Sequence, residues 1–239
     1  VAQKTTSAWL NAWITEPKKF RPNTRMPQFF GLSNQHDAHG TDFSPVEIAS
    51  VAHYLVTRST DAPLDSPAAG YKPDIARGKQ AFSQRGCLAC HSHDAVPDPD
   101  KKLSATFGPN LSQIHLKIRH DADKAPTDPS DSGFRWLYTW LRKPQQHHPR
   151  TRMPDLFLDP DKDSDPAADI AAFLLAKDQG SYPVPNMDKG FKKNLDRLVT
   201  LYMGKVLGER RAEEVVKKKL AYPETDPEKI AGDEKELVG

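Results

Sequence analysis

The sequence Cys87-Leu88-Ala89-Cys90-His91 decides the interpretation of this chain, and it holds the only two cysteines among the 239 residues. The spacing Cys-x-x-Cys-His is the attachment signature of c-type haem. Each thiol can form a thioether bond to a haem vinyl group, and the neighbouring imidazole can bind the iron. Residues three and four apart lie on one face of a helical turn, so all three side chains can reach one porphyrin. The motif therefore predicts one covalent haem c on Cys87 and Cys90, with His91 as an iron ligand.

Three other uses of the two cysteines are weaker. A structural zinc site takes a second ligand pair after a longer spacer, and the sequence offers only His93 nearby. A thioredoxin-like redox pair lies beside a βαβ pattern, which we do not find. A disulfide between Cys87 and Cys90 leaves His91 without a role. A zinc site could use Cys87, Cys90 and His91 as well, but the spacing of the three residues favours haem attachment.

Composition narrows the class of protein. The net charge is +2 with acidic and basic residues interspersed, so we expect no nucleic-acid partner, which would need a concentrated basic face. The 21 prolines and the mean hydropathy of −0.70 indicate short helices joined by polar loops. No apolar run is long enough to cross a bilayer, so we expect no transmembrane segment. Val1 does not open a signal peptide, and we expect the N-terminus to be a processed end or a cut within a longer protein.

Apolar residues at helical spacing predict an all-α fold, and no alternating pattern typical of strands appears. The expected helices span residues 7–15, 45–58, 74–85, 134–142, 166–177 and 191–219, the last being either one long helix or two with a break at Gly208. Proline-rich stretches at 61–73 and from Tyr182 onward indicate linkers. The expected parts are 1–60, a linker 61–73, a complete domain 74–180, and a linker with a helical segment at 181–239.

An internal repeat relates the first and third of these parts at an offset of 127 residues. Over residues 9–30 and 136–157, ten of 22 positions are identical. The identical residues of the first copy are Trp9, Leu10, Trp13, Pro17, Pro22, Thr24, Arg25, Met26, Pro27 and Phe30. After a gap, residues 49–55 resemble residues 168–174.

The repeat is incomplete, because the first copy lacks a Cys-x-x-Cys-His segment. At the other end of the chain, Glu236-Leu237-Val238-Gly239 resembles Ile75-Ala76-Arg77-Gly78, which precedes the cysteines. Our hypothesis is that the chain is an excerpt of a tandem multihaem protein.

Residues 74–177 resemble a class I cytochrome c domain. The resemblance rests on the following residues, which occur in the order typical of the family: Gly78, Phe82, Cys87-Leu88-Ala89-Cys90-His91, Gly108-Pro109-Asn110-Leu111, Trp140-Leu141, Pro144 and Arg152-Met153-Pro154. The tandem arrangement resembles, more weakly, the large multidomain cytochromes of planctomycete-type bacteria. The resemblance implies an electron carrier outside the cytoplasm, in the periplasm by default.

The resemblance also implies roles for particular residues. His91 is the proximal iron ligand, its ring oriented by the Pro109 carbonyl, and Leu111 packs on the haem. Met153 is the expected distal ligand, with His147 and His148 as rivals in the same loop. Trp140 is expected either to donate its indole N–H to a haem propionate or to pack in the core, and Arg150 and Arg152 are expected either to pair with propionates or to be ordinary solvated charges. Phe82 and Phe173 are expected to pack where the first and last helices cross, with Gly78 allowing close approach. His93 and His115 are expected at the surface. Met26 is expected to ligate a haem whose attachment segment is missing here.

Two other functions compete with electron transfer. A haem enzyme of the multihaem peroxidase kind needs a displaceable sixth ligand and a distal acid–base group, for which His147 and His148 are candidates. A sensor or interaction module would use haem only as a structural staple. For the electron carrier, the expected partners are a redox protein or neighbouring haem domains.

Overall fold

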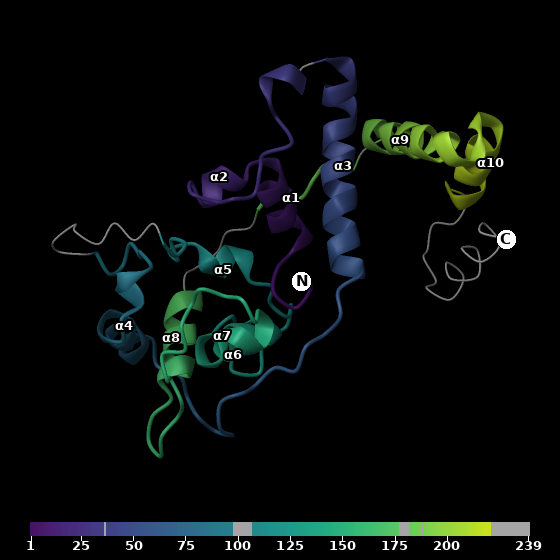
Figure 1. The fold of residues 1–239 in the computed structure, drawn as a ribbon. Coiled ribbons are helices and arrows are strands. Elements are labelled where there is room, and N and C mark those ends of the chain that lie inside the picture. The colour runs from purple at the N-terminus through teal and green to yellow at the C-terminus, as the bar shows by residue number, and fades with distance from the viewer. Residues whose placement is uncertain (36, 98–106, 177–181, 188, 221–239) are drawn as a thin grey trace. The chain divides into compact units, whose positions relative to one another are not determined.

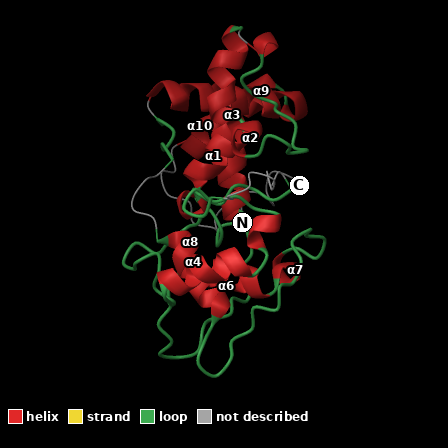
Figure 2. Ribbon diagram, turned by 90° about the vertical axis from the view of Figure 1, so that its left-hand side faces the viewer, coloured by secondary structure: helices red, strands yellow, loops and turns green. Residues whose placement is uncertain are grey.

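The computed structural model describes residues 1–35, 37–97, 107–176, 182–187 and 189–220. Helices joined by long loops make up these residues, as Figure 2 shows. Extended structure in the described ranges is limited to two isolated bridges, Thr5 with Ile118 and His93 with Val96. The expected all-α fold is confirmed.

The α-helices follow one another along the chain (Figure 1) as α1 (Ser7–Thr15), α2 (Pro17–Phe20), α3 (Ala38–Thr57), α4 (Ile75–Gln84), α5 (Ile114–Lys117), α6 (Ser132–Arg142), α7 (Pro144–His147), α8 (Pro166–Leu175), α9 (Lys189–Leu207) and α10 (Glu209–Leu220). Two 3₁₀ turns complete the set, η1 (Ser33–Gln35) and η2 (Cys87–Ala89).

Aspartate caps explain where the three long helices around the cysteines begin. Asp74, Asp131 and Asp165 precede α4, α6 and α8, and each side chain accepts a hydrogen bond from the backbone N–H three residues later. Such a cap satisfies one of the unpaired donors of the first turn and contributes about 1 kcal/mol. The starts of these helices are therefore encoded locally.

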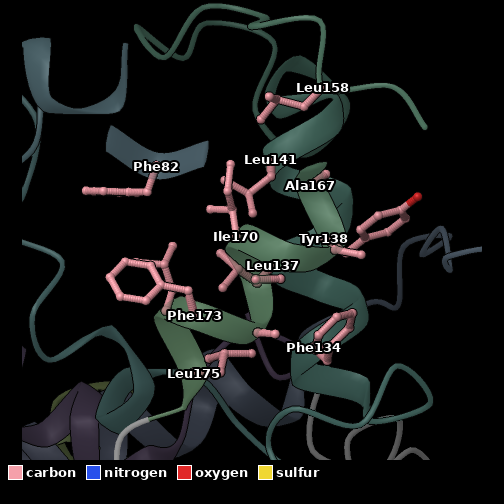
Figure 3. Close-up of a cluster of buried hydrophobic side chains, with 14 of the residues drawn as sticks. Phe82, Phe134, Leu137, Tyr138, Leu141, Leu158, Ala167, Ile170, Phe173 and Leu175 are labelled. Carbon is pink, nitrogen blue, oxygen red and sulfur yellow. The ribbon is translucent and has the colours of Figure 1, made fainter. Parts of the chain in front are cut away.

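Helices α4 and α8 cross at Gly78, as the sequence predicted. A Cβ atom at this position would lie 1.9 Å from the carbonyl oxygen of Asp169 and 2.9 Å from Cβ of Phe173. Phe82 and Phe173 pack beside the crossing with ring centroids 5.6 Å apart, and both belong to the hydrophobic cluster drawn in Figure 3. Only glycine allows the two backbones to approach this closely.

Two of the expected helices differ in extent or continuity. Helix α3 begins at Ala38 instead of Pro45, so the proline lies inside the helix. The additional turns carry Asp42, which accepts a 2.8 Å hydrogen bond from Arg197 of α9. The segment 191–219 is broken at Gly208, where φ is +81°, as the sequence suggested. The resemblance of residues 236–239 to 75–78 lies outside the described residues.

The chain divides into two compact units, each made of two stretches of sequence. One unit comprises residues 1–37 and 47–185, and the other comprises 38–46 and 186–239. Residues 1–37 and 47–60 therefore lie in the same unit as the cysteine-bearing segment, whereas residues 38–46 belong to the other unit. The bridge between Thr5 and Ile118 and a 3.1 Å hydrogen bond from Arg119 N–H to the Lys4 carbonyl join residues 1–37 to the cysteine-bearing segment.

Candidate functional site

The cysteine motif forms one tight turn at the end of α4. Gly86 stops that helix with φ +83°, and the 3₁₀ turn η2 follows directly. The His91 N–H donates to the Cys87 carbonyl at 2.9 Å, so the two thiols and the imidazole come from a single turn of backbone. Both thiols are free, and burial raises the pKa of Cys87 to about 11.

The His91 ring is oriented by a backbone carbonyl. Its Nδ1 lies 2.8 Å from the carbonyl oxygen of Pro109, and a carbonyl can only accept, so Nδ1 carries the proton. Burial lowers the pKa of His91, which favours the neutral imidazole. The lone pair therefore lies on Nε2, where a metal would bind, and the hydrogen bond at Nδ1 is the type that fixes a ligating histidine.

Gly108 provides the space in which this ring lies. A Cβ atom there would be 2.6 Å from His91 Cε1 and 2.5 Å from the Cys90 carbonyl oxygen. The Gly108 N–H also donates to that carbonyl at 2.7 Å, and Leu111 is buried in the core two residues after Pro109. The backbone of the segment Gly108–Leu111 therefore holds the imidazole of His91 in place.

Met153 lies half-buried in the loop after α7. Its sulfur accepts a 3.0 Å hydrogen bond from Nε1 of Trp140, and its backbone N–H donates to Thr151 Oγ1 at 3.2 Å. A thioether sulfur has two lone pairs, so one remains for a metal. The Trp140 N–H, for which a haem propionate is one expected acceptor, donates here to the Met153 sulfur.

The other expected contacts are placed as follows. Arg152 is exposed, and its guanidinium lies 5.7 Å from the ring centroid of Phe107. His147 is stacked on Trp136 with ring centroids 5.0 Å apart. His148 is exposed.

His93 differs from the expectation of a surface position. It is 4% exposed, and its ring lies 4.7 Å from that of Phe173 and 5.8 Å from that of Phe82. Its Nδ1 accepts a hydrogen bond from the Ala95 N–H at 3.1 Å. His93 is therefore a core residue at the α4–α8 crossing, because the loop after the cysteine turn folds back over that crossing.

Two lysines lie on the indole rings where the N-terminal segment meets the cysteine-bearing segment. The ammonium of Lys4 is 4.6 Å from the ring centroid of Trp136, and that of Lys117 is 4.3 Å from the ring centroid of Trp9. Burial lowers the pKa of both, that of Lys117 to about 7. Sequence reasoning missed this pair, because no local pattern links residues so distant in the chain.

The residues present fit a covalently attached haem. Two free thiols and a neutral imidazole share one turn, the carbonyl of Pro109 orients the ring, and Gly108 leaves room for it. In the described residues, no group of three or more His, Cys, Asp or Glu side chains could by itself hold a metal ion.

The sequence profile of the family Cytochrome c matches residues 75–178. Residues 75–178 form a cytochrome c domain. It runs from the start of α4 through α8 and contains the cysteine turn, the segment Gly108–Leu111 and Met153. Comparisons with curated proteins and with solved structures gave no match. Across the described parts of the chain, no helix has the length and apolar character to span a membrane.

Proposed function

We propose that the chain carries single electrons through one haem c, bound covalently by Cys87 and Cys90 and ligated by His91 and Met153. The cytochrome c domain supports a haem-binding protein of electron transfer. When bound, the haem supplies an iron centre that gains or loses one electron. No acid, base or nucleophile of the protein needs to act in that step.

The hydrogen bond between His91 and Pro109 is the observation that best supports this proposal. It fixes the imidazole tautomer with Nε2 unprotonated, which is the form a proximal ligand requires. A backbone acceptor also holds the ring in one orientation in both redox states, so little rearrangement accompanies the transfer.

The proposed role of Met153 rests on its sulfur being held in place. The Trp140 N–H and the Thr151 hydroxyl fix the side chain and backbone of the residue. Pro154 follows and restricts Met153 to extended backbone angles, which suits a loop laid against a flat ligand. Ligation by histidine and methionine raises the reduction potential relative to two histidines.

The proposed partners are a redox protein or neighbouring haem domains, and the proposed location is the periplasm or another compartment outside the cytoplasm. Support comes from the incomplete sequence repeat and from the resemblance described above. A multihaem chain, of which these residues would be a part, is the arrangement that we propose.

The test is the substitution Met153→Leu in protein matured with covalent haem. We expect the wild type to be low-spin when oxidised, with the far-red sulfur-to-iron charge-transfer band. The variant should lose that band, and its reduction potential should shift by a sizeable part of the ~0.8 V range that axial ligands span. Met187→Leu is the matched control, because Met187 is 65% exposed and lies outside the cytochrome c domain.

Two outcomes would contradict the proposal. If Met153→Leu keeps the far-red band, another residue supplies the sixth ligand. If the oxidised wild type is high-spin, the sixth position is open, which favours the peroxidase alternative. Intact mass checks the attachment itself, because Cys87→Ser with Cys90→Ser should remove the mass of the covalent haem.

A further inference from the structure

The loop that carries Met26 has the same geometry as the loop that carries Met153. Trp13 Nε1 donates to Met26 Sδ at 3.0 Å, the distance found between Trp140 and Met153. The Met26 N–H donates to Thr24 Oγ1 at 3.2 Å, which again equals the value in the second loop. The N-terminal segment (residues 1–60) therefore holds a methionine sulfur in the manner of the cytochrome c domain.

The elements leading to each methionine also agree. The indole pairs are stacked with centroids 5.3 Å apart in the first copy and 5.6 Å apart in the second. A four-residue helix with a buried proline follows in both, α2 after α1 and α7 after α6. The duplication is thus one of three-dimensional geometry as well as of sequence.

Helix α3 corresponds to α8 in this duplication, but one of its faces is exposed. Val51, Tyr54 and Leu55 are 44%, 61% and 36% exposed. The aligned residues of α8 are the apolar Ile170, Phe173 and Leu174, which are 0%, 7% and 3% exposed. The opposite face of α3 is buried as in α8, since Ile48 and Ala52 pack with Trp9, Leu10 and Ile14.

Helix α4 and the segment that follows it cover that face of α8. Gly78 lies against the Asp169 carbonyl, and Phe82 packs on Phe173; Figure 3 shows Phe82, Ile170 and Phe173 in one cluster. The same helix leads directly into the cysteine turn. In the part of the chain that the structure describes, the apolar face of α3 therefore lacks a counterpart of α4, the helix that leads into the haem-attachment residues.

We propose that the N-terminal segment forms one half of a second haem site, in which the sulfur of Met26 binds the iron. The occupant is a haem-bearing helix and Cys-x-x-Cys-His segment from outside these 239 residues, and its helix packs on Val51, Tyr54 and Leu55 as α4 packs on α8. This inference rests on the proposed role of Met153, from which the role of Met26 is transferred.

The alignment of α3 with α8 also predicts which residues the occupant's helix has where it meets α3. It presents a glycine toward the carbonyl of Ser50, which aligns with Asp169, and an aromatic ring toward Tyr54, which aligns with Phe173. Asp169 accepts hydrogen bonds from Arg77 at 2.8 and 3.0 Å. Because serine replaces that carboxylate, the occupant needs no arginine at the position of Arg77.

The experiment uses the full chain with its own covalent haem, titrated with a synthetic haem c peptide that has the sequence of residues 74–91. The peptide supplies thioether-bound haem and a proximal histidine but no sixth ligand from the protein. We expect one peptide to bind per chain and a second far-red sulfur-to-iron band to appear in the oxidised complex. Absence of saturable binding, or binding without the second band, overturns the proposal.

Four variants identify the residues responsible. Met26→Leu should abolish the second band, whereas Met153→Leu should abolish the first band and leave the second. Tyr54→Asp on the protein, or Gly78→Ala in the peptide, should weaken binding at least tenfold, because each blocks the helix crossing. A second band that survives in Met26→Leu contradicts the assignment.

This experiment distinguishes a failure of the ligation proposed for Met153 from a failure of the second haem site. If the resident haem lacks the far-red band before any peptide is added, the ligation proposed for Met153 is wrong. If the resident band is present and the peptide does not acquire its own, only the second site is wrong. Circular dichroism and the absorption of the covalent haem verify that each variant is folded.

Discussion

At the scale of single residues, hydrogen bonds position the atoms that we propose as haem ligands. Pro109 leaves Nε2 as the unprotonated nitrogen of His91, and Trp140 donates to the sulfur of Met153. The hydrogen bond from Trp140 changes the electron density on the Met153 sulfur. An N–H directed at sulfur withdraws electron density from it, so under the proposed ligation the sulfur would donate less to oxidised iron and the reduced state would be favoured.

Trp140→Phe should therefore lower the reduction potential while the far-red sulfur band persists, because an aromatic ring remains at this position and the N–H donor is lost. The measurement is a redox titration followed by absorption. Trp13→Phe is the matched control, since it removes the equivalent donor beside Met26 and should leave the potential of the resident haem unchanged. A Trp140→Phe variant with the wild-type potential would show that the N–H does not act on the bound sulfur.

At the scale of elements, the crossing of α4 and α8 positions the cysteine turn. Beside Gly78, the buried carboxylate of Asp169 accepts hydrogen bonds from the Tyr71 hydroxyl, the Asp74 N–H and the Arg77 guanidinium. A buried carboxylate with several donors specifies one register of the two helices, because any shift leaves the charge unpaired.

Gly78→Ala should destabilise the protein by about 3 kcal/mol or prevent folding, since the added methyl group meets the Asp169 backbone at 1.9 Å. Chemical denaturation monitored by circular dichroism measures the effect. Gly204→Ala in α9 is the matched control, because the nearest atom to its Cβ is 3.9 Å away. Alanine favours a helix by about 1 kcal/mol over glycine, so the control should be neutral or stabilising.

At the scale of the whole molecule, the N-terminal segment packs against the cytochrome c domain through contacts between residues distant in sequence. Lys117 of α5 lies on Trp9 of α1, and Lys4 lies on Trp136 of α6. In the described residues, no ion pair joins either lysine to a carboxylate. The cation–π contacts offset only part of the cost of burying two like charges.

Lys117→Met should stabilise the protein at pH 6 by about 1 kcal/mol or more, because it removes a charge that burial disfavours. The folded pKa of Lys117 is about 7, against an ordinary value of 10.5. Between these values the unfolded chain binds a proton that the folded chain does not, so wild-type stability should rise with pH across this window.

The measurement is the free energy of unfolding at pH 6, 8 and 10, with Lys79→Met, at an exposed position of α4, as the control. The Lys117→Met variant should show a shallower rise with pH than the wild type, and the control should not. Equal slopes in wild type and variant would mean that Lys117 keeps its proton in the folded state.

The sequence by itself determined the features that depend on near neighbours. The cysteine turn, the aspartate caps, the break at Gly208 and the glycine at the helix crossing follow from local spacing and backbone preference, and the Cys-x-x-Cys-His motif indicated the family. Only the tertiary structure decided that His93 is buried, that Trp140 is directed to the Met153 sulfur, that Lys117 lies on Trp9 and that one apolar face of α3 is exposed. Each of these depends on which segments meet in space, and burial and long-range contacts are properties of the assembled chain that residue spacing does not encode.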